Sequence, residues 1–196
     1  VYPIARGSAP PLVALAAWLL PSHQVLNLLQ MAGVVSISAG ILSLAADRPM
    51  NREHRWEPIV FGLGTGLTIM AYTLCDGEGI RHAGDRQAQQ IGYIVWLFVL
   101  EAPLLALYCL WQRGREALQF VGKNWKLGLC GAALSLAAYG IAIIAMRFGE
   151  FAHVSALRET SVIFAAVMSA YLLNERFRKR RYVSVSLVAL GAVLLH

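Results

Sequence analysis

Hydrophobic residues along this chain come in long blocks that short polar segments separate. Seven blocks are visible: Tyr2–Leu20, Leu26–Ala46, Pro58–Gly79, Ile91–Trp111, Leu127–Met146, Ala152–Leu173 and Tyr182–Leu195. A helix needs about 20 mostly apolar residues to cross the hydrocarbon core of a bilayer. Most blocks reach about that length, and their polar connections are too short to form a separate soluble domain. The pattern therefore predicts an all-α integral membrane protein with seven transmembrane helices.

Composition supports the same class of protein. Of the 196 residues, 58% are hydrophobic and 14% are charged, and the mean hydropathy is +0.57. Soluble domains carry about 25% charged residues. The net charge of +6 does not indicate nucleic-acid binding, because the basic residues gather at the ends of the apolar blocks. Membrane topology places basic residues at those positions.

The sequence carries no pattern typical of an enzyme. The five histidines are scattered, and the three cysteines lie inside apolar blocks without the spacing of metal ligands. Neither a Ser-His arrangement nor a Gly-Lys-Ser phosphate loop is visible. We therefore expect no catalytic activity, no bound metal and no cofactor.

The distribution of charge predicts an orientation. Seven spans place twelve basic residues on one side of the membrane and three on the other. The positive-inside rule then assigns the loops around Arg52, Lys123 and Lys179 to the cytoplasm, and it leaves His196 outside.

The first and sixth blocks resemble each other. A shift of 152 positions places Arg6 on Arg158 and Ser8 on Thr160. An odd number of crossings separates the two helices, so they run in opposite directions through the membrane. Inverted repeats of this kind are typical of secondary transporters.

Several motifs carry a family resemblance. Residues 1–10 (VYPIARGSAP) and 156–164 (ALRETSVIF) resemble the fourth and ninth helices of EamA-type permeases of the drug/metabolite transporter superfamily. Residues 172–177 (LLNERF) and 71–81 (AYTLCDGEGIR) resemble the break after the ninth helix and the end of the sixth helix.

The resemblance implies a ten-helix fold of two inverted five-helix repeats. Residues 1–46 would be the end of the first repeat, 47–57 a linker and 58–196 the second repeat. Since the chain starts at Val1 within an apolar block, we expect the first three helices to be missing. The first repeat lacks the acidic residue that Glu175 supplies in the second. The resemblance also implies a cytoplasmic C-terminus, whereas the charge distribution places His196 outside.

The function implied by the resemblance is that of a permease in the cell membrane, the inner membrane in a Gram-negative bacterium. It would move a small organic metabolite or drug by alternating access. Its partners would be the lipid bilayer and the solute. We expect no nucleic-acid partner, and the sequence leaves open whether the protein forms a homodimer. The alternatives are a non-transporting membrane scaffold and an inactive transporter fragment.

Charged residues inside the spans are the first site candidates, because an arginine at mid-bilayer costs about 2.5–3.5 kcal/mol on insertion scales. Arg6 and Arg158 would favour an anionic group of the solute, such as a carboxylate. Alternatively, each binds backbone carbonyls or a neighbouring acid and holds helices in register. Glu159 points about 100° away from Arg158, so we do not expect these two to pair. Pro3, Pro10 and Pro11 are expected to break the first helix beside Arg6.

The remaining candidates lie in other parts of the spans. Tyr2, Tyr72 and Tyr139 could donate hydrogen bonds to a solute, or they could be packing residues. Glu101, next to Pro103, is a candidate proton carrier, or a neutral and hydrogen-bonded side chain beside a kink. Asp76 and Arg81 either cap their helix or form a gate.

Overall fold

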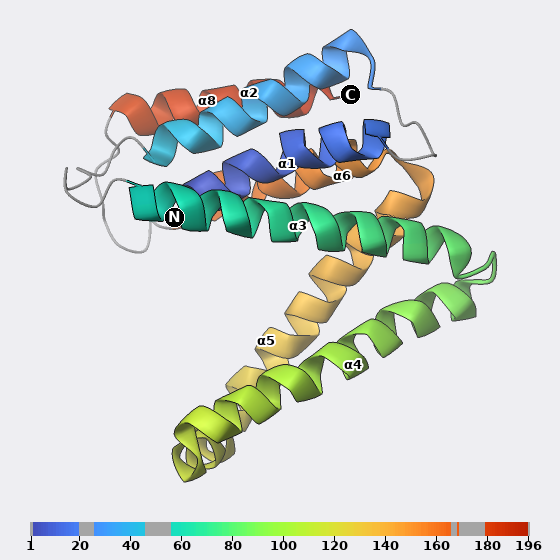
Figure 1. Ribbon diagram of the computed structural model, residues 1–196, viewed down its shortest axis with the longest axis vertical. Coiled ribbons are helices and arrows are strands. Elements are labelled where there is room, and N and C mark those ends of the chain that lie inside the picture. Colours follow the sequence, from blue (N-terminus) through green and yellow to red (C-terminus); the bar gives the residue numbers. More distant parts are fainter. Residues whose placement is uncertain (1, 20–25, 46–55, 166–167, 169–178, 196) are drawn as a thin grey trace. The chain divides into compact units, whose positions relative to one another are not determined.

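The computed structural model describes residues 2–19, 26–45, 56–165, 168 and 179–195. Within these residues, seven helices account for the fold (Figure 1). They are α1 (Tyr2–Leu19), α2 (Leu28–Ala45), α3 (Trp56–His82), α4 (Gln87–Arg113), α5 (Arg115–Phe148), α6 (Phe151–Glu159) and α8 (Lys179–Leu194). The predicted all-helical class is confirmed for this part of the chain.

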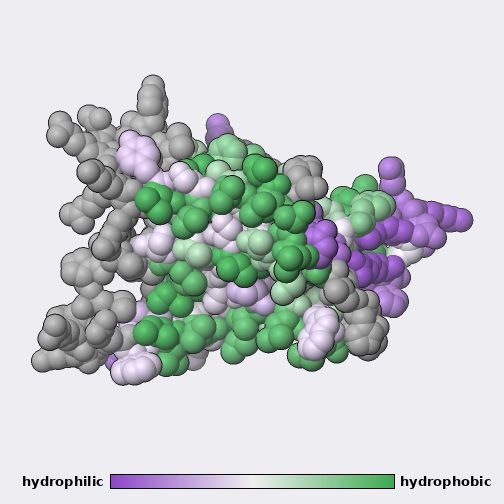
Figure 2. Space-filling model, turned by 90° about the horizontal axis from the view of Figure 1, so that it is seen from above, coloured by the Kyte–Doolittle hydropathy of each residue, from purple (hydrophilic) through white to green (hydrophobic). Residues whose placement is uncertain are grey.

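Three of these helices, α3, α4 and α5, are long and apolar enough to cross a membrane by length and composition. Shorter apolar stretches occupy Leu28–Ser43 of α2 and Tyr182–Leu194 of α8. Large apolar side chains are exposed on the surface, among them Leu104, Trp111 and Leu127. Figure 2 shows hydrophobic side chains over much of the face that it presents. An exposed apolar surface of this kind is expected to face the hydrocarbon core of a bilayer.

The chain divides into two compact units. One consists of Val1–Asp76 and Gly149–His196, and the other consists of Gly77–Phe148. Each unit has its own internal packing.

The core of the first unit forms where α2 and α8 pack side by side (Figure 1). Buried Val34, Ile37 and Ile41 of α2 lie in one cluster with Val188 of α8 and Leu195, which follows α8. Gly33 lies beside Gly191, and Gly40 lies beside Ser184, so the two helices run antiparallel. A Cβ atom on Gly33 would lie 2.9 Å from the Gly191 carbonyl oxygen. The backbones therefore touch directly, as they do where small residues line a membrane helix pair.

Hydroxyl groups join the same two helices. The Ser36 hydroxyl donates to the Leu187 carbonyl oxygen over 2.9 Å, and the Ser43 and Ser184 hydroxyls lie 2.5 Å apart. Inside an apolar medium such groups need a partner within the protein. They therefore hold α2 and α8 in register as well as in contact.

In the second unit, the connection between α3 and α4 is bound to the end of α5. The Arg147 guanidinium donates to the Asp85 carboxylate over 2.5 Å and also to the Gly84 carbonyl oxygen. Arg81 Nε donates to the Met146 carbonyl oxygen over 3.3 Å. Gly84 has φ +96°, a backbone conformation that other residues rarely adopt, and this allows the tight turn.

The expectation that prolines break the first helix is wrong. Pro10 and Pro11 lie inside α1, which is continuous from Tyr2 to Leu19. Neighbouring helices, Ser and Thr side chains and local adjustments can compensate for a missing proline N–H in membrane helices. The chain leaves regular helix elsewhere, at Thr160 in the predicted sixth span. There the Thr160 N–H donates to the Leu157 carbonyl oxygen over 3.1 Å.

We predict that Gly191→Ala destabilises the first unit by about 1–3 kcal/mol, the usual cost of overpacking. Its new Cβ would lie 2.7 Å from the Gly33 carbonyl oxygen and 2.9 Å from the Ile37 backbone nitrogen. The measurement is the thermal unfolding midpoint of the full-length protein in detergent. The matched control is Gly64→Ala on α3, where a Cβ meets nothing within 4 Å. Equal midpoints for the two variants would show that the backbones are not in close contact.

Candidate functional site

An ion pair joins α1 to α6 in the first unit. Arg6 Nη1 donates to Glu159 Oε1 over 2.9 Å, across 153 positions of sequence. The Glu159 side chain is 4% exposed, whereas that of Arg6 is 32% exposed. A charge in an apolar medium requires a partner of opposite sign. The pair therefore brings opposite charges together and ties the two helices to each other.

Small buried residues flank both charged side chains of the pair. Arg6 is flanked on α1 by buried Ala5 and Gly7. A Cβ atom on Gly7 would lie 3.2 Å from the Ser38 carbonyl oxygen, so α1 also lies close to α2. Glu159 is the last residue of α6 and belongs to its buried face with Ser155 and Ala156. The carboxylate is thus placed where the regular helix ends.

Arg6 keeps hydrogen-bonding capacity beyond this pair. A guanidinium has five N–H donors. Among the described residues, its one hydrogen bond is to Glu159. The Tyr2 ring centroid lies 5.5 Å from Arg6 Cζ, and the Tyr72 phenol of α3 is close enough to interact electrostatically with the guanidinium. Tyr2 and Tyr72 are both exposed, and 32% of the Arg6 side chain is accessible beside them.

The second carboxylate oxygen of Glu159 has a different environment from the first. Oε2 is buried, and it has no hydrogen-bond partner within the part of the chain that the structure describes. Arg158, half-buried on the same helix, is within electrostatic range of this carboxylate. The site therefore combines two arginines with one buried carboxylate.

The structure places the predicted site residues in two groups. Arg6, Tyr2, Tyr72, Arg158 and Glu159 all belong to the first unit, around the ion pair. The alternative in which an arginine binds a neighbouring acid is what the structure shows for Arg6. The pairing of Arg6 with Glu159 was missed by sequence reasoning, although each is an intramembrane charge and the two have opposite signs.

The other candidates have separate surroundings. The Tyr139 ring packs edge-on against Phe98, with ring centroids 6.0 Å apart. Asp76 is buried on α3, and Arg81 bonds the Met146 carbonyl oxygen. Glu101 is exposed on α4. Tyr139, Arg81 and Glu101 belong to the second unit.

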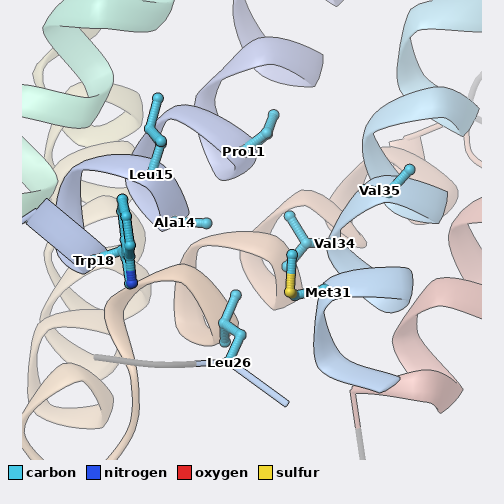
Figure 3. Close-up of a pocket in the computed structure, with 8 residues that line it drawn as sticks. All are labelled: Pro11, Ala14, Leu15, Trp18, Leu26, Met31, Val34 and Val35. Carbon is cyan, nitrogen blue, oxygen red and sulfur yellow. The ribbon is translucent and has the colours of Figure 1, made fainter. Parts of the chain in front are cut away.

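A cavity of about 460 Å³ lies between α1 and α2 (Figure 3). Its lining residues are Pro11, Ala14, Leu15, Trp18, Leu26, Met31, Val34 and Val35. This lining is apolar, whereas a specific solute site needs a few convergent polar groups to orient the solute. The ion pair is therefore the better candidate for the site that recognises a solute.

Comparison with known proteins gives one match. A family model described as the EamA-like transporter family matches residues 55–196, which include Arg158 and Glu159. Comparisons with curated proteins and with solved structures give no match.

We predict that Arg6→Gln destabilises the protein more than Glu159→Gln does. The first variant leaves a buried carboxylate without its cation, at a cost of about 1–3 kcal/mol or more, whereas the second leaves an arginine that reaches the surface. The double variant should recover about 0.5–3 kcal/mol of the summed loss, as expected for residues in contact. Unfolding midpoints of the full-length protein measure this cycle. Strict additivity of the two single losses would contradict the ion pair.

Proposed function

The chain belongs to the EamA-like transporter family, and from this premise we propose that it is a secondary transporter of a small organic metabolite or drug. It would act in the cell membrane by alternating access. Support comes from the family match, from three helices able to span a membrane and from the exposed apolar surface.

The proposed architecture is that of two inverted five-helix repeats. Residues 1–46 would end the first repeat, 47–57 would link the two, and 58–196 would form the second. The family match begins at residue 55, within the proposed linker, which supports this division. The antiparallel pairing of α2 with α8 is also what opposed repeats require. Solute sites in such folds lie near the bilayer midplane, where the repeats meet.

We propose that Arg6 binds the solute. The main support for this proposal is that the guanidinium of Arg6 is partly exposed. One of its N–H groups is held by Glu159, and the accessible edge lies beside Tyr2 and Tyr72. A guanidinium binds carboxylates with two parallel hydrogen bonds, which gives both energy and orientation. We therefore propose that the solute carries an anionic group such as a carboxylate.

The ion pair also suggests how binding is coupled to movement. Glu159 and a solute anion would compete for the same guanidinium, since both are acceptors of its hydrogen bonds. Exchange of one for the other would loosen the connection between α1 and α6. A ligand shifts a conformational equilibrium only through different contacts in the two states. The exchange at Arg6 supplies such a difference.

The test is a thermal-shift screen of the purified full-length protein against small organic anions, cations and neutral metabolites. A ligand at about 100 times its dissociation constant stabilises the protein by about 2.7 kcal/mol. We expect the stabilising compounds to be anions. Each hit is then measured for flux into proteoliposomes.

Two variants locate the binding site. Arg6→Gln should weaken binding of the anionic hit at least about tenfold, which is about 1.4 kcal/mol. Arg115→Gln, which removes an exposed arginine at the start of α5, is the matched control and should leave binding unchanged. Wild-type affinity in Arg6→Gln would remove Arg6 from the site.

A further inference from the structure

The two oxygens of the Glu159 carboxylate have unequal surroundings, and the proposed solute site does not account for this. Oε1 accepts a hydrogen bond from Arg6, whereas Oε2 is buried without a donor among the described residues. An ionised oxygen kept from water without a donor is unfavourable. A proton on Oε2 reduces this penalty, because a neutral hydroxyl group costs less to bury than an ionised oxygen.

The groups around Glu159 determine what a proton would do to the site. Among the described residues, the helices that pack against α6 are α1 and α2. From α1, Arg6 acts on the carboxylate, and Tyr2 lies beside Arg6. The sequence of α2 contains no ionisable residue. On α6 itself Arg158 acts on the carboxylate, and Tyr72 of α3 acts on Arg6. Within the described part of the chain, both charges that act on Glu159 are therefore positive.

A solute anion bound at Arg6 would place a second negative charge close to the Glu159 carboxylate. Two like charges close together in an apolar medium repel each other, and a proton on Glu159 removes this repulsion. Binding of the anion and binding of the proton therefore favour each other.

We propose that Glu159 takes up one proton on Oε2 together with each solute anion bound at Arg6, so that proton and anion cross the membrane together. This inference rests on the proposed function of the same site. In the step, an O–H bond forms between Oε2 and a proton from the solution on the open side. The Arg6 hydrogen bond to Oε1 then weakens, because its acceptor is no longer charged. The freed N–H binds the anion, and the proton leaves Oε2 on the opposite side.

The first test needs no solute. The full-length protein is placed in phosphatidylcholine nanodiscs, and infrared difference spectra are recorded as the pH is lowered. The expected result is a protonated-carboxyl band that Glu159→Gln removes. Glu101→Gln is the matched control, since it deletes an exposed carboxyl of α4, and it should keep the band. An unchanged band in Glu159→Gln, or loss of the band in Glu101→Gln only, would overturn the proposal.

Folding of each variant is checked first by circular dichroism and size-exclusion elution. If Glu159→Gln does not fold, Glu159→Asp replaces it, because it keeps a carboxyl group on a shorter side chain. That variant should keep the band with a changed midpoint in pH. A midpoint equal to that of the wild type would overturn the proposal.

The second test asks whether protonation frees Arg6. Phenylglyoxal, which modifies accessible guanidinium groups, is added at a series of pH values, and peptide mass spectrometry compares Arg6 with exposed Arg115. In the wild type the ratio of Arg6 to Arg115 modification should rise as the carboxyl band grows, and in Glu159→Gln it should be high throughout. A ratio independent of pH in the wild type would contradict the release of Arg6.

These tests separate the inference from the proposed function. If an anion binds at Arg6 but Glu159 does not titrate, the proton coupling is wrong and the transporter proposal stands. If Glu159 titrates as described but no anion binds or crosses, the proposed function is wrong and Glu159 remains a proton site.

Discussion

The need to pair a buried charge away from water governs the contact between α1 and α6. Glu159 is almost fully buried, and its one described donor is Arg6 on a helix that begins the chain. The pair fixes how α1 and α6 face each other, and it does so through groups that can also exchange partners. A hydrophobic contact at this position could not respond to an anion or a proton.

The packing of α2 against α8 follows a different constraint. In lipid, apolar surfaces gain little by leaving their surroundings, so helices associate through close packing and hydrogen bonds instead. Gly33, Gly191 and the paired serines supply both. Large apolar side chains of α4 and α5 remain exposed, which a lipid environment allows. The lipid environment thus explains where the small, the hydroxyl-bearing and the large apolar residues lie.

Much of the helical architecture could be predicted from the sequence, because length and hydropathy decide which segments span a membrane. The backbone of α5 is non-helical at Asn124 (φ −115°, ψ 19°), so regular helix resumes close to the predicted start at Leu127, and a further helical stretch from Arg115 precedes it. The prediction that prolines break the first helix was wrong, because tertiary packing overrides the low helix propensity of proline. The partner of Arg6 could not be predicted, since it depends on the rotation of two helices that lie 153 positions apart. The sequence did, however, identify both residues as candidates.

The backbone contact between Gly33 and Gly191 has a mechanical consequence. A contact between main chains contains no rotamers, so it neither adapts gradually nor loses side-chain entropy when it forms. Together with the serine hydrogen bonds, this contact makes α2 and α8 a rigid helix pair. Movement in the first unit then falls to α1 and α6, whose contact includes an ion pair that can exchange partners. This rigid pair would stay fixed while α1 and α6 move relative to it.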